Sequence, residues 1–362
     1  MKKFKILISG GGTGGHIFPA LAIAKAIEKQ VMDVEFLFVG AQNRMEMEKI
    51  PNEGYKIIGL WISGLQRGFN VSNLLFPFKL LYSIWMAKKI IKEFNPDLAI
   101  GTGGYASAPL LYVAAKSGIP SLIQEQNSYP GITNKILSRY VQKVCVAYNK
   151  MELFFPLHKV ILTGNPIRED ILGFKDSRKE KEDLFEINVL KPTILIIGGS
   201  LGALTINNAI ADNIHKLNQI GVNLIWQTGT SYQQKAKHLI SKINIKGINA
   251  YTFIKEMDTA YAAADIIISR AGAIAISELC YVGKPVILVP SPNVAENHQY
   301  KNAQSLVNNN AALLVEDADA NCKLVDTLEA LIQDEDLKLS LSNNIKKMAV
   351  NNSANRIAKI AL

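Results

Sequence analysis

The sequence predicts an α/β protein made of two doubly wound domains, each with a parallel sheet covered by helices on both faces. Three observations support this prediction. Short apolar segments alternate with segments of helical periodicity, the apolar segments are apolar at nearly every position, and the pattern restarts after Asn165–Pro166. Strands that are apolar on both faces are typical of parallel sheets buried between helices. The length of 362 residues also suits two ordinary domains.

The expected strands form two series with helical patterns such as Pro19–Ile27 between them. In chain order they are Phe4–Ser9, Val34–Val39, Leu98–Ile100, Ser121–Gln124 and Val144–Ala147, then Thr193–Ile197, Asn223–Gln227, Asp265–Ser269 and Pro285–Val289. We therefore expect an N-terminal domain over residues 1–165 and a C-terminal domain over 166–340. The charge-dense stretch Lys175–Asp183 should lie at the surface. The basic final segment, about 341–362, should pack back on the first domain.

Charge and cysteine content narrow the class of protein. Residues 1–168 carry 20 Lys and Arg against 10 Asp and Glu, whereas the rest carries 20 against 21. The basic half is therefore the one expected to meet an anionic surface. Three cysteines far apart indicate reduced core thiols and neither a disulfide framework nor a zinc site. No apolar run reaches the roughly 18 residues of a membrane span, and the N-terminal run is too short for a signal peptide, so we expect a cytoplasmic protein.

Three glycine-rich turns each follow an expected strand and open a helix. They are Gly10–His16, Gly101–Tyr105 and Gly198–Ala203. This placement directs backbone N–H groups and the positive end of a helix dipole toward one crevice, where phosphate can bind. The first turn also matches the GxGxxG fingerprint of dinucleotide-binding proteins, but the second strand ends without the acid that would hold a ribose. A nicotinamide enzyme is therefore disfavoured.

The glycine-rich turns belong to a longer series of motifs. In order these are Gly11–His16 followed by Pro19-Ala20, Gly103–Tyr105, Glu125–Asn127, Thr163–Arg168, Gly198–Ser200, Arg270–Ala273 with Ser277-Glu278, and Asn297–Tyr300. In this order and over essentially the whole chain, the sequence resembles the MurG family of bacterial N-acetylglucosaminyltransferases. The resemblance implies the GT-B fold, in which two Rossmann-like domains face a central cleft. It also implies an inverting transfer from UDP-N-acetylglucosamine to lipid I, undecaprenyl-pyrophosphoryl-N-acetylmuramoyl-pentapeptide, which yields lipid II.

The resemblance also assigns substrate-binding residues. Those implied for the donor are Thr13, Gly14, Gly15, Asn127, Arg168, Ser200, Ile254, Ala273, Ile274, Ala275, Ile276, Ser277, Glu278 and Gln299, and those for the acceptor are Gly103, Gly104 and Tyr105. We expect Ser200 and Arg168 at the diphosphate and Glu278, at the start of a helix, at the ribose. Ile254 should form an apolar wall for uracil. Arg168 as an interdomain ion pair and Glu278 as a solvated helix-start acid are the alternatives.

Catalysis by inversion needs a base that accepts the proton of the attacking hydroxyl. His16 is the expected base, because imidazole titrates near neutral pH and this one lies in the first glycine turn. Two alternatives are that His16 positions substrate or binds the acceptor pyrophosphate as a cation, and that Glu125 is the base. The acidic pairs in Asp317–Asp319 and Asp334–Asp336 are expected to be solvated helix-start acids, so no metal site and no bound cofactor are predicted.

The segment Phe69–Phe94 combines apolar and basic residues. It includes Leu75, Phe76, Phe78, Trp85, Lys88 and Lys89. An apolar cluster with aromatic anchors and a basic rim suits a helix in the headgroup region of an anionic membrane, and an ordinary core helix is the alternative. We expect a peripheral protein at the cytoplasmic face of the membrane. Other cell-wall synthesis proteins are the further partners expected, and no nucleic acid.

Other functions share parts of this pattern. A different GT-B glycosyltransferase acting on a glycolipid, or a UDP-sugar 2-epimerase, would have the same fold and phosphate turns. A non-enzymatic scaffold would be expected to lack His16, Arg168 or Glu278, and all three are present.

Overall fold

The computed structural model describes residues 3–64, 74–172, 182–188, 190–199, 202–243 and 246–362. The chain forms two compact units. Unit 1 comprises Met1–Ile167 and Val350–Leu362, and unit 2 comprises Arg168–Ala349.

Unit 1 contains, in its described residues, one parallel sheet of seven strands in the order β3-β2-β1-β4-β5-β6-β7. The strands are β1 Phe4–Gly10, β2 Val34–Ala41, β3 Lys56–Leu60, β4 Leu98–Gly103, β5 Ser121–Glu125, β6 Lys143–Val146 and β7 Val160–Leu162. The helices are α1 Gly14–Glu28, α2 Glu46–Asn52, α3 Phe76–Phe94, α4 Ser107–Lys116, α5 Ile132–Leu137 and α16 Ser353–Ala361, with 3₁₀ turns η2 Met151–Leu153 and η3 Leu157–Lys159.

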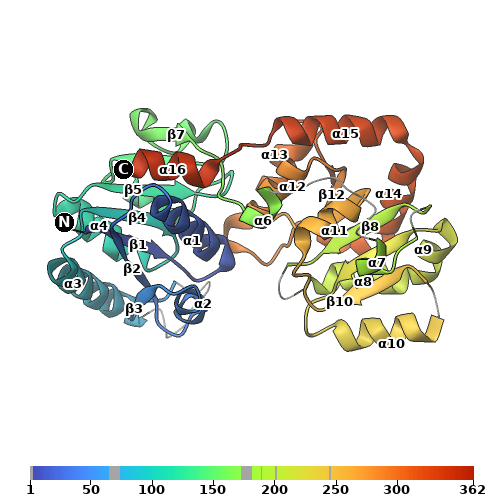
Figure 1. Ribbon diagram of the computed structural model, residues 1–362, viewed down its shortest axis with the longest axis horizontal. Helices are drawn as coiled ribbons and strands as arrows, with labels where there is room; N and C mark the ends of the chain where they lie inside the picture. Colours follow the sequence, from blue (N-terminus) through green and yellow to red (C-terminus); the bar gives the residue numbers. More distant parts are fainter. Residues whose placement is uncertain (1–2, 65–73, 173–181, 189, 200–201, 244–245) are drawn as a thin grey trace. The chain divides into compact units, whose positions relative to one another are not determined.

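Helices cover both faces of this sheet (Figure 1). On β1, Ile6 and Ile8 join a core with residues of α1, α2 and α16. The residue between them, Leu7, joins a second core with residues of α3, α4 and α5. Because successive side chains of a strand point to opposite faces, a strand between two cores has no polar face. The uninterrupted apolar runs of the central strands follow from this burial.

The C-terminal segment returns to unit 1, where α16 packs against α1 (Figure 1). The return was expected from about residue 341, but the structure begins it at Val350 and leaves α15, Glu335–Lys347, in unit 2. In α16, Ile357 and Ala358 are fully buried in the core beneath α1. The helix is amphipathic, and its apolar stripe finds its partner there.

Unit 2 contains, within the described residues, a parallel sheet of six strands in the order β10-β9-β8-β11-β12-β13. The strands are β8 Thr193–Ile197, β9 Asn223–Gln227, β10 Ile248–Tyr251, β11 Ile266–Ser269, β12 Val286–Leu288 and β13 Leu313–Leu314. The helices are α6 Glu169–Leu172, α7 Glu182–Phe185, α8 Leu204–Asp212, α9 Ile214–Ile220, α10 Gln233–Ile243, α11 Met257–Ala263, α12 Ala273–Val282, α13 His298–Val307, α14 Ala320–Gln333 and α15, with 3₁₀ turns η4 Ala295–Asn297 and η5 Asp317–Asp319. Of the expected surface stretch Lys175–Asp183, residues 175–181 lie outside the described part.

No helix in the described part of the chain is both long enough and apolar enough to cross a membrane.

The cysteines differ in exposure, and this predicts their reactivity. Burial raises the pKa of the Cys145 and Cys280 thiols to about 12 each, whereas Cys322 is exposed. The expectation of three core thiols is therefore wrong for Cys322. Because the thiolate is the reactive form, a thiol reagent at pH 8 should modify one cysteine rapidly in the native protein and all three after denaturation. A Cys322→Ser variant that still reacts rapidly in its native state would contradict this assignment.

Candidate active site

The first glycine turn lies where the strand order of unit 1 reverses. Strands β1 and β4 are neighbours, and the chain moves outward from them in opposite directions. In doubly wound sheets, ligands bind in the crevice at the carboxyl ends of the strands at this point. Thr13 is the N-cap residue of α1, and Gly14 and Gly15 are its first two residues. The first-turn N–H groups of a helix have no carbonyl partner within it, which suits an anionic or hydroxylated ligand.

The turn holds the side chain of His16 in a defined orientation. Nδ1 of His16 lies 2.9 Å from the Gly11 carbonyl oxygen, which can only accept a hydrogen bond. A proton on Nδ1 satisfies this contact and makes Nε2 the acceptor, so we assign that tautomer. The backbone supports the same geometry, because the Thr102 hydroxyl donates to the His16 carbonyl oxygen over 2.8 Å.

Two of the three expected acceptor residues, Gly103 and Gly104, pack directly against this turn. A Cβ added to Gly103 would lie 3.0 Å from Nε2 of His16, so the glycine makes room for the ring. Gly104 has φ +88° and would clash with the Gly11 carbonyl oxygen if it carried a Cβ. Both glycines are therefore required by the close approach of two turns. Tyr105 follows them and is 47% exposed.

Glu125, at the end of β5, is buried and organises its own loop. Its carboxylate accepts hydrogen bonds from the Asn127 N–H (3.0 Å), the Asn127 amide (3.2 Å), the Gly131 N–H (3.1 Å) and the Asn134 amide (2.9 Å). Burial raises the pKa of the Glu125 carboxyl, and these hydrogen bonds oppose that shift. The arrangement holds Asn127 in place beside the strand end.

An amide network ties this loop to the end of β7. Gln124 donates to the Asn165 side chain over 2.8 Å, and Asn165 donates to the Gln126 carbonyl oxygen over 3.0 Å. The Gln126 amide in turn donates to the Thr102 carbonyl oxygen over 2.7 Å. These buried contacts give the two motifs Glu125–Asn127 and Thr163–Arg168 a shared structural role.

Sequence reasoning missed Glu46, the first residue of α2. Its side chain is fully buried, and its carboxylate accepts from the Gly12 N–H over 2.9 Å and from the Ala41 N–H over 3.0 Å. The sequence does show an acidic residue at a helix start shortly after β2. Acidic residues are common at helix starts because they interact favourably with the helix dipole, so this one did not stand out.

Unit 2 has its own reversal of strand order between β8 and β11. Gly198 and Gly199 follow β8, whereas the expected diphosphate residue Ser200 lies outside the described residues. Gln227, which sequence reasoning also missed, bridges this turn to the next one. Its amide donates to the Gly199 carbonyl oxygen over 3.0 Å and accepts from the Ile254 N–H over 3.0 Å.

The side chain of Ile254 is not an accessible wall. It is 3% exposed, and its N–H is bonded to Gln227, whereas the neighbouring Phe253 is 51% exposed. Within this unit, Phe253 is therefore the more accessible apolar side chain. Ile254 lies in the loop after β10, and its N–H joins that loop to Gln227, the last residue of β9.

Arg168 and Glu278 form a two-point ion pair within unit 2. Nε of Arg168 donates to Oε1 of Glu278 over 3.0 Å and Nη2 donates to Oε2 over 3.3 Å. The hydroxyl of Tyr261, on α11, donates to Oε2 over 3.2 Å. Both partners belong to unit 2, so this ion pair is not the interdomain pair that the sequence analysis considered.

Glu278 lies within α12, not at its start. The helix begins at Ala273, and the expected donor segment Ala273–Glu278 forms its first six residues. Ala273, Ile274 and Ala275 are half-buried, Ile276 is buried, and the Ser277 hydroxyl donates to the Ala273 carbonyl oxygen over 3.1 Å. Glu278 is 6% exposed, so the alternative of a solvated acid is also wrong.

Gln299, on α13, supports the loop after β12. Its side-chain oxygen accepts from the Ser291 N–H over 2.8 Å.

The acidic pairs considered for a metal have structural partners. Asp317 pairs with Arg270 and accepts from the Thr205 hydroxyl over 3.0 Å, and Asp319 pairs with Lys323. Asp334 caps α15 by accepting from the Leu337 N–H over 2.8 Å. Asp317 is thus part of a largely buried ion pair, unlike the expected solvated acid. Within the described residues, no cluster of three metal-ligating side chains occurs.

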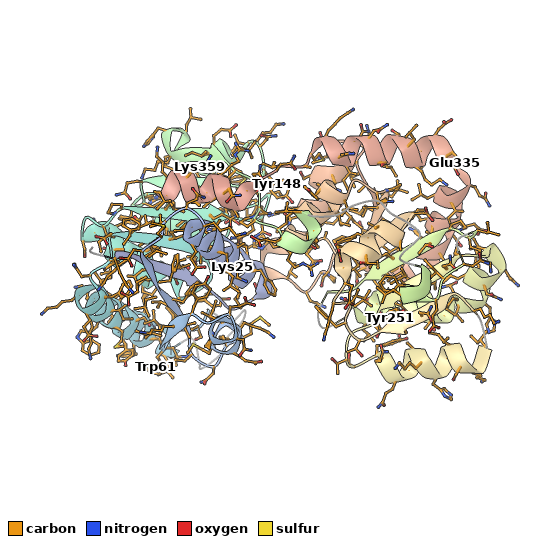
Figure 2. The ribbon with its side chains drawn as sticks, viewed as in Figure 1. Lys25, Trp61, Tyr148, Tyr251, Glu335 and Lys359 are labelled. Atoms are coloured by element: carbon orange, nitrogen blue, oxygen red, sulfur yellow. The ribbon has the colours of Figure 1, made fainter. Side chains whose placement is uncertain are left out.

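One face of α3 exposes large apolar side chains. Phe78, Leu81 and Trp85 are 66%, 66% and 57% exposed. The same surface includes Leu75, at 48%, and exposed Lys88 and Lys89, whereas Phe76 is only half-exposed. Trp61 lies beside α3 at the surface of unit 1 (Figure 2), with its ring 6.0 Å from that of Tyr82. Residues 69–73 of the expected segment lie outside the described part. We call the exposed residues Leu75, Phe78, Leu81, Tyr82 and Trp85 the α3 patch.

Comparison with known proteins places the whole chain in one family. Residues 6–146 match the glycosyltransferase family 28 N-terminal domain and residues 193–359 match the family 28 C-terminal domain. A protein of Parabacteroides distasonis is 50% identical over 357 residues, which cover 99% of this chain and 97% of the relative. A protein of Phocaeicola vulgatus is 52% identical over 360 residues, with 99% and 96% covered. Both are named UDP-N-acetylglucosamine–N-acetylmuramyl-(pentapeptide) pyrophosphoryl-undecaprenol N-acetylglucosamine transferase.

A solved structure agrees with the sequence comparisons. The crystal structure of MurG from Acinetobacter baumannii has a TM-score of 0.81 and 28% identity to this chain, with 99% of each chain covered. The chain therefore belongs to glycosyltransferase family 28 and, within it, to the MurG family of N-acetylglucosamine transferases.

Proposed function

We propose that this protein transfers N-acetylglucosamine from UDP-N-acetylglucosamine to the 4-hydroxyl of the N-acetylmuramoyl unit of lipid I, with inversion at the anomeric carbon. The observation that carries the proposal is identity of about half of all residues, over 99% of the chain, to relatives named for this reaction. The glycine-rich turns that begin after β1 and β8 also support transfer from a nucleotide sugar, because turns of this kind bind phosphate groups.

His16 acts as the general base in this proposal. With Nδ1 bonded to the Gly11 carbonyl, Nε2 accepts the proton of the acceptor hydroxyl as its oxygen attacks the anomeric carbon. The bond from that carbon to UDP breaks on the opposite face. Glu125 is the less suitable base, because its carboxylate already accepts four hydrogen bonds, three from its own loop and one from Asn134 on α5. Its role is to fix Asn127, whose amide can read a sugar hydroxyl.

The departing UDP is stabilised by groups of unit 2. Arg168 provides a permanent cation, and the guanidinium fork can hold a carboxylate and meet a phosphate oxygen at the same time. Glu278, held by Arg168 and Tyr261, provides carboxylate oxygens that can accept from ribose hydroxyls. The ion pair between Arg168 and Glu278 therefore holds the proposed phosphate-binding and ribose-binding side chains in a defined position relative to each other.

A direct assay tests the reaction. Radiolabelled UDP-N-acetylglucosamine and a short-chain lipid I analogue should give a labelled disaccharide-lipid product, and an acceptor without the 4-hydroxyl should give none. Transfer to the deoxy acceptor would contradict the assigned hydroxyl. Conversion of UDP-N-acetylglucosamine into its 2-epimer without acceptor would contradict the transferase assignment.

The α3 patch is proposed to contact an anionic membrane at its cytoplasmic face. Its exposed aromatic and aliphatic side chains provide an apolar anchor, and Lys88 and Lys89 provide a basic rim. Such a surface would bring the protein to a lipid-linked acceptor. Salt screens the attraction between the basic rim and anionic lipid headgroups, so binding to the membrane should weaken as the salt concentration rises.

Removing the anchor should separate two activities. Phe78→Ser with Trp85→Ser should reduce binding to vesicles of phosphatidylglycerol and phosphatidylcholine and lower activity on a long-chain acceptor. Activity on a soluble short-chain acceptor should survive, because these exposed side chains fill no core. Leu339→Ser, at a residue 62% exposed in unit 2, is the matched control and should change neither. Equal loss of both activities in the double variant would refute the membrane role.

A further inference from the structure

Glu46 is a buried carboxylate to which the proposed mechanism gives no role. It is fully buried at the start of α2, and no ion pair to it forms within the residues that the structure describes. A buried, unpaired carboxylate is energetically costly, and hydrogen bonds must compensate for lost hydration. The surrounding backbone is shaped for it, since a Cβ on Gly40 would lie 2.5 Å from Cγ of Glu46 and one on Gly11 would overlap with Oε1.

The carboxylate and the His16 ring bind the same peptide group. Oε2 of Glu46 accepts from the Gly12 N–H over 2.9 Å, and Nδ1 of His16 lies 2.9 Å from the Gly11 carbonyl oxygen. These N–H and C=O groups are the two ends of one planar amide. A hydrogen bond at one end of an amide polarises it and strengthens the hydrogen bond at the other end.

We propose that Glu46 is a positioning residue that acts on His16 through the Gly11–Gly12 peptide. The anion increases the negative charge on the Gly11 carbonyl oxygen, which then holds the Nδ1 proton more strongly and favours the imidazolium that forms when Nε2 accepts a proton. In the catalytic triads of hydrolases, the carboxylate accepts directly from the imidazole Nδ1–H. Here a peptide group lies between the carboxylate and the imidazole. The second carboxylate oxygen ties the turn to the end of β2 through the Ala41 N–H.

Other titratable groups near this turn are oriented differently. The Glu125 carboxylate accepts from its own loop and from Asn134 on α5. The Tyr105 ring, from the turn after β4, lies against Gly64. Thr13, beside Nδ1 at 3.4 Å, and Thr102, at the His16 carbonyl, carry no charge. Glu46 is thus an anion coupled to the His16 ring through the Gly11–Gly12 peptide.

This inference rests on the proposed role of His16, but its central test does not need catalysis. The chain has five histidines, so ¹³C labelling at the imidazole carbons gives few resonances, and a His16→Gln variant identifies the one from His16. Removing a nearby anion destabilises an imidazolium, so Glu46→Gln should lower the titration midpoint of His16 by about 0.5–1 pH unit. The rising limb of the kcat profile should move to lower pH by the same amount, and the plateau should fall because the base is weaker.

Asp97→Asn is the matched control. Asp97 also accepts a backbone N–H of β1, that of Lys5 over 2.9 Å, but near the amino end of the strand. This variant should lower the melting temperature without moving the His16 midpoint. A Glu46→Gln protein that is less stable and less active but titrates His16 at the native midpoint would overturn the proposal and leave Glu46 a structural clamp.

Reciprocity provides a second measurement if Glu46→Gln does not fold. Coupling between two sites is equal in both directions, so the ¹³C chemical shift of the Glu46 carboxyl should change when His16 takes up its proton, and His16→Gln should abolish that change. The carboxyl resonance is assigned with Glu46→Asp. A carboxyl resonance that does not respond to protonation of His16 would overturn the coupling. A response that His16→Gln abolishes, together with a kcat unaffected by His16→Ala, would instead retain the coupling and remove His16 as the base.

Discussion

Replacing His16 by alanine should lower kcat by about 10²–10⁴-fold, the usual contribution of a general base. The physical reason is that the proton leaves the acceptor hydroxyl in the transition state, whereas the imidazole adds little to binding of the donor. The affinity for UDP, measured by calorimetry, should therefore change much less than kcat. A loss that appears in kcat and not in donor binding is the signature of an interaction made in the transition state.

His158→Ala is a suitable control for this experiment, because His158 lies in η3 at the amino end of β7, whereas the first glycine turn follows the carboxyl end of β1 in the same parallel sheet. It should leave kcat close to the native value. If His16→Ala keeps the native kcat and raises only the acceptor KM, His16 binds the acceptor, and Glu125 becomes the residue to test as base.

Replacing Arg168 by alanine should weaken UDP binding by about ten-fold or more, because a charge-assisted contact is worth about 1.5–3 kcal/mol. The same change leaves the Glu278 carboxylate, 6% exposed, without the cation that it pairs with. Removing one member of a buried pair is destabilising, so the melting temperature should fall as well. Both quantities are measured on the same protein.

The double variant Arg168→Ala with Glu278→Gln separates these effects. It removes the unpaired charge, so the melting temperature should recover in part, whereas UDP affinity should stay low. Arg168→Lys should retain the charge but lose the two-point geometry, and its affinity should fall between the native and alanine values. UDP affinity that is unchanged in Arg168→Ala would contradict the phosphate assignment.

The interior strands could be predicted from sequence, because burial on both faces requires an uninterrupted apolar run. Such a run can be recognised without knowing which strands lie beside it. The four strands that the sequence analysis did not identify are β3, β7, β10 and β13, and each lies at an edge of its sheet. Their residues are mostly half-buried. An edge strand borders one neighbour and partly faces solvent, so its sequence carries a weaker signal.

The sequence by itself also determined the glycine turns and His16, because a turn between a strand and a helix is a local structure with local requirements. The tertiary structure alone decided which side chains act together. Arg168 and Glu278 are 110 residues apart in the chain, and Glu46 meets the first turn only because β1 and β2 pair side by side. Hydrogen bonds and ion pairs act over a few ångströms in space, and the folding of the chain, not its local pattern, sets those distances.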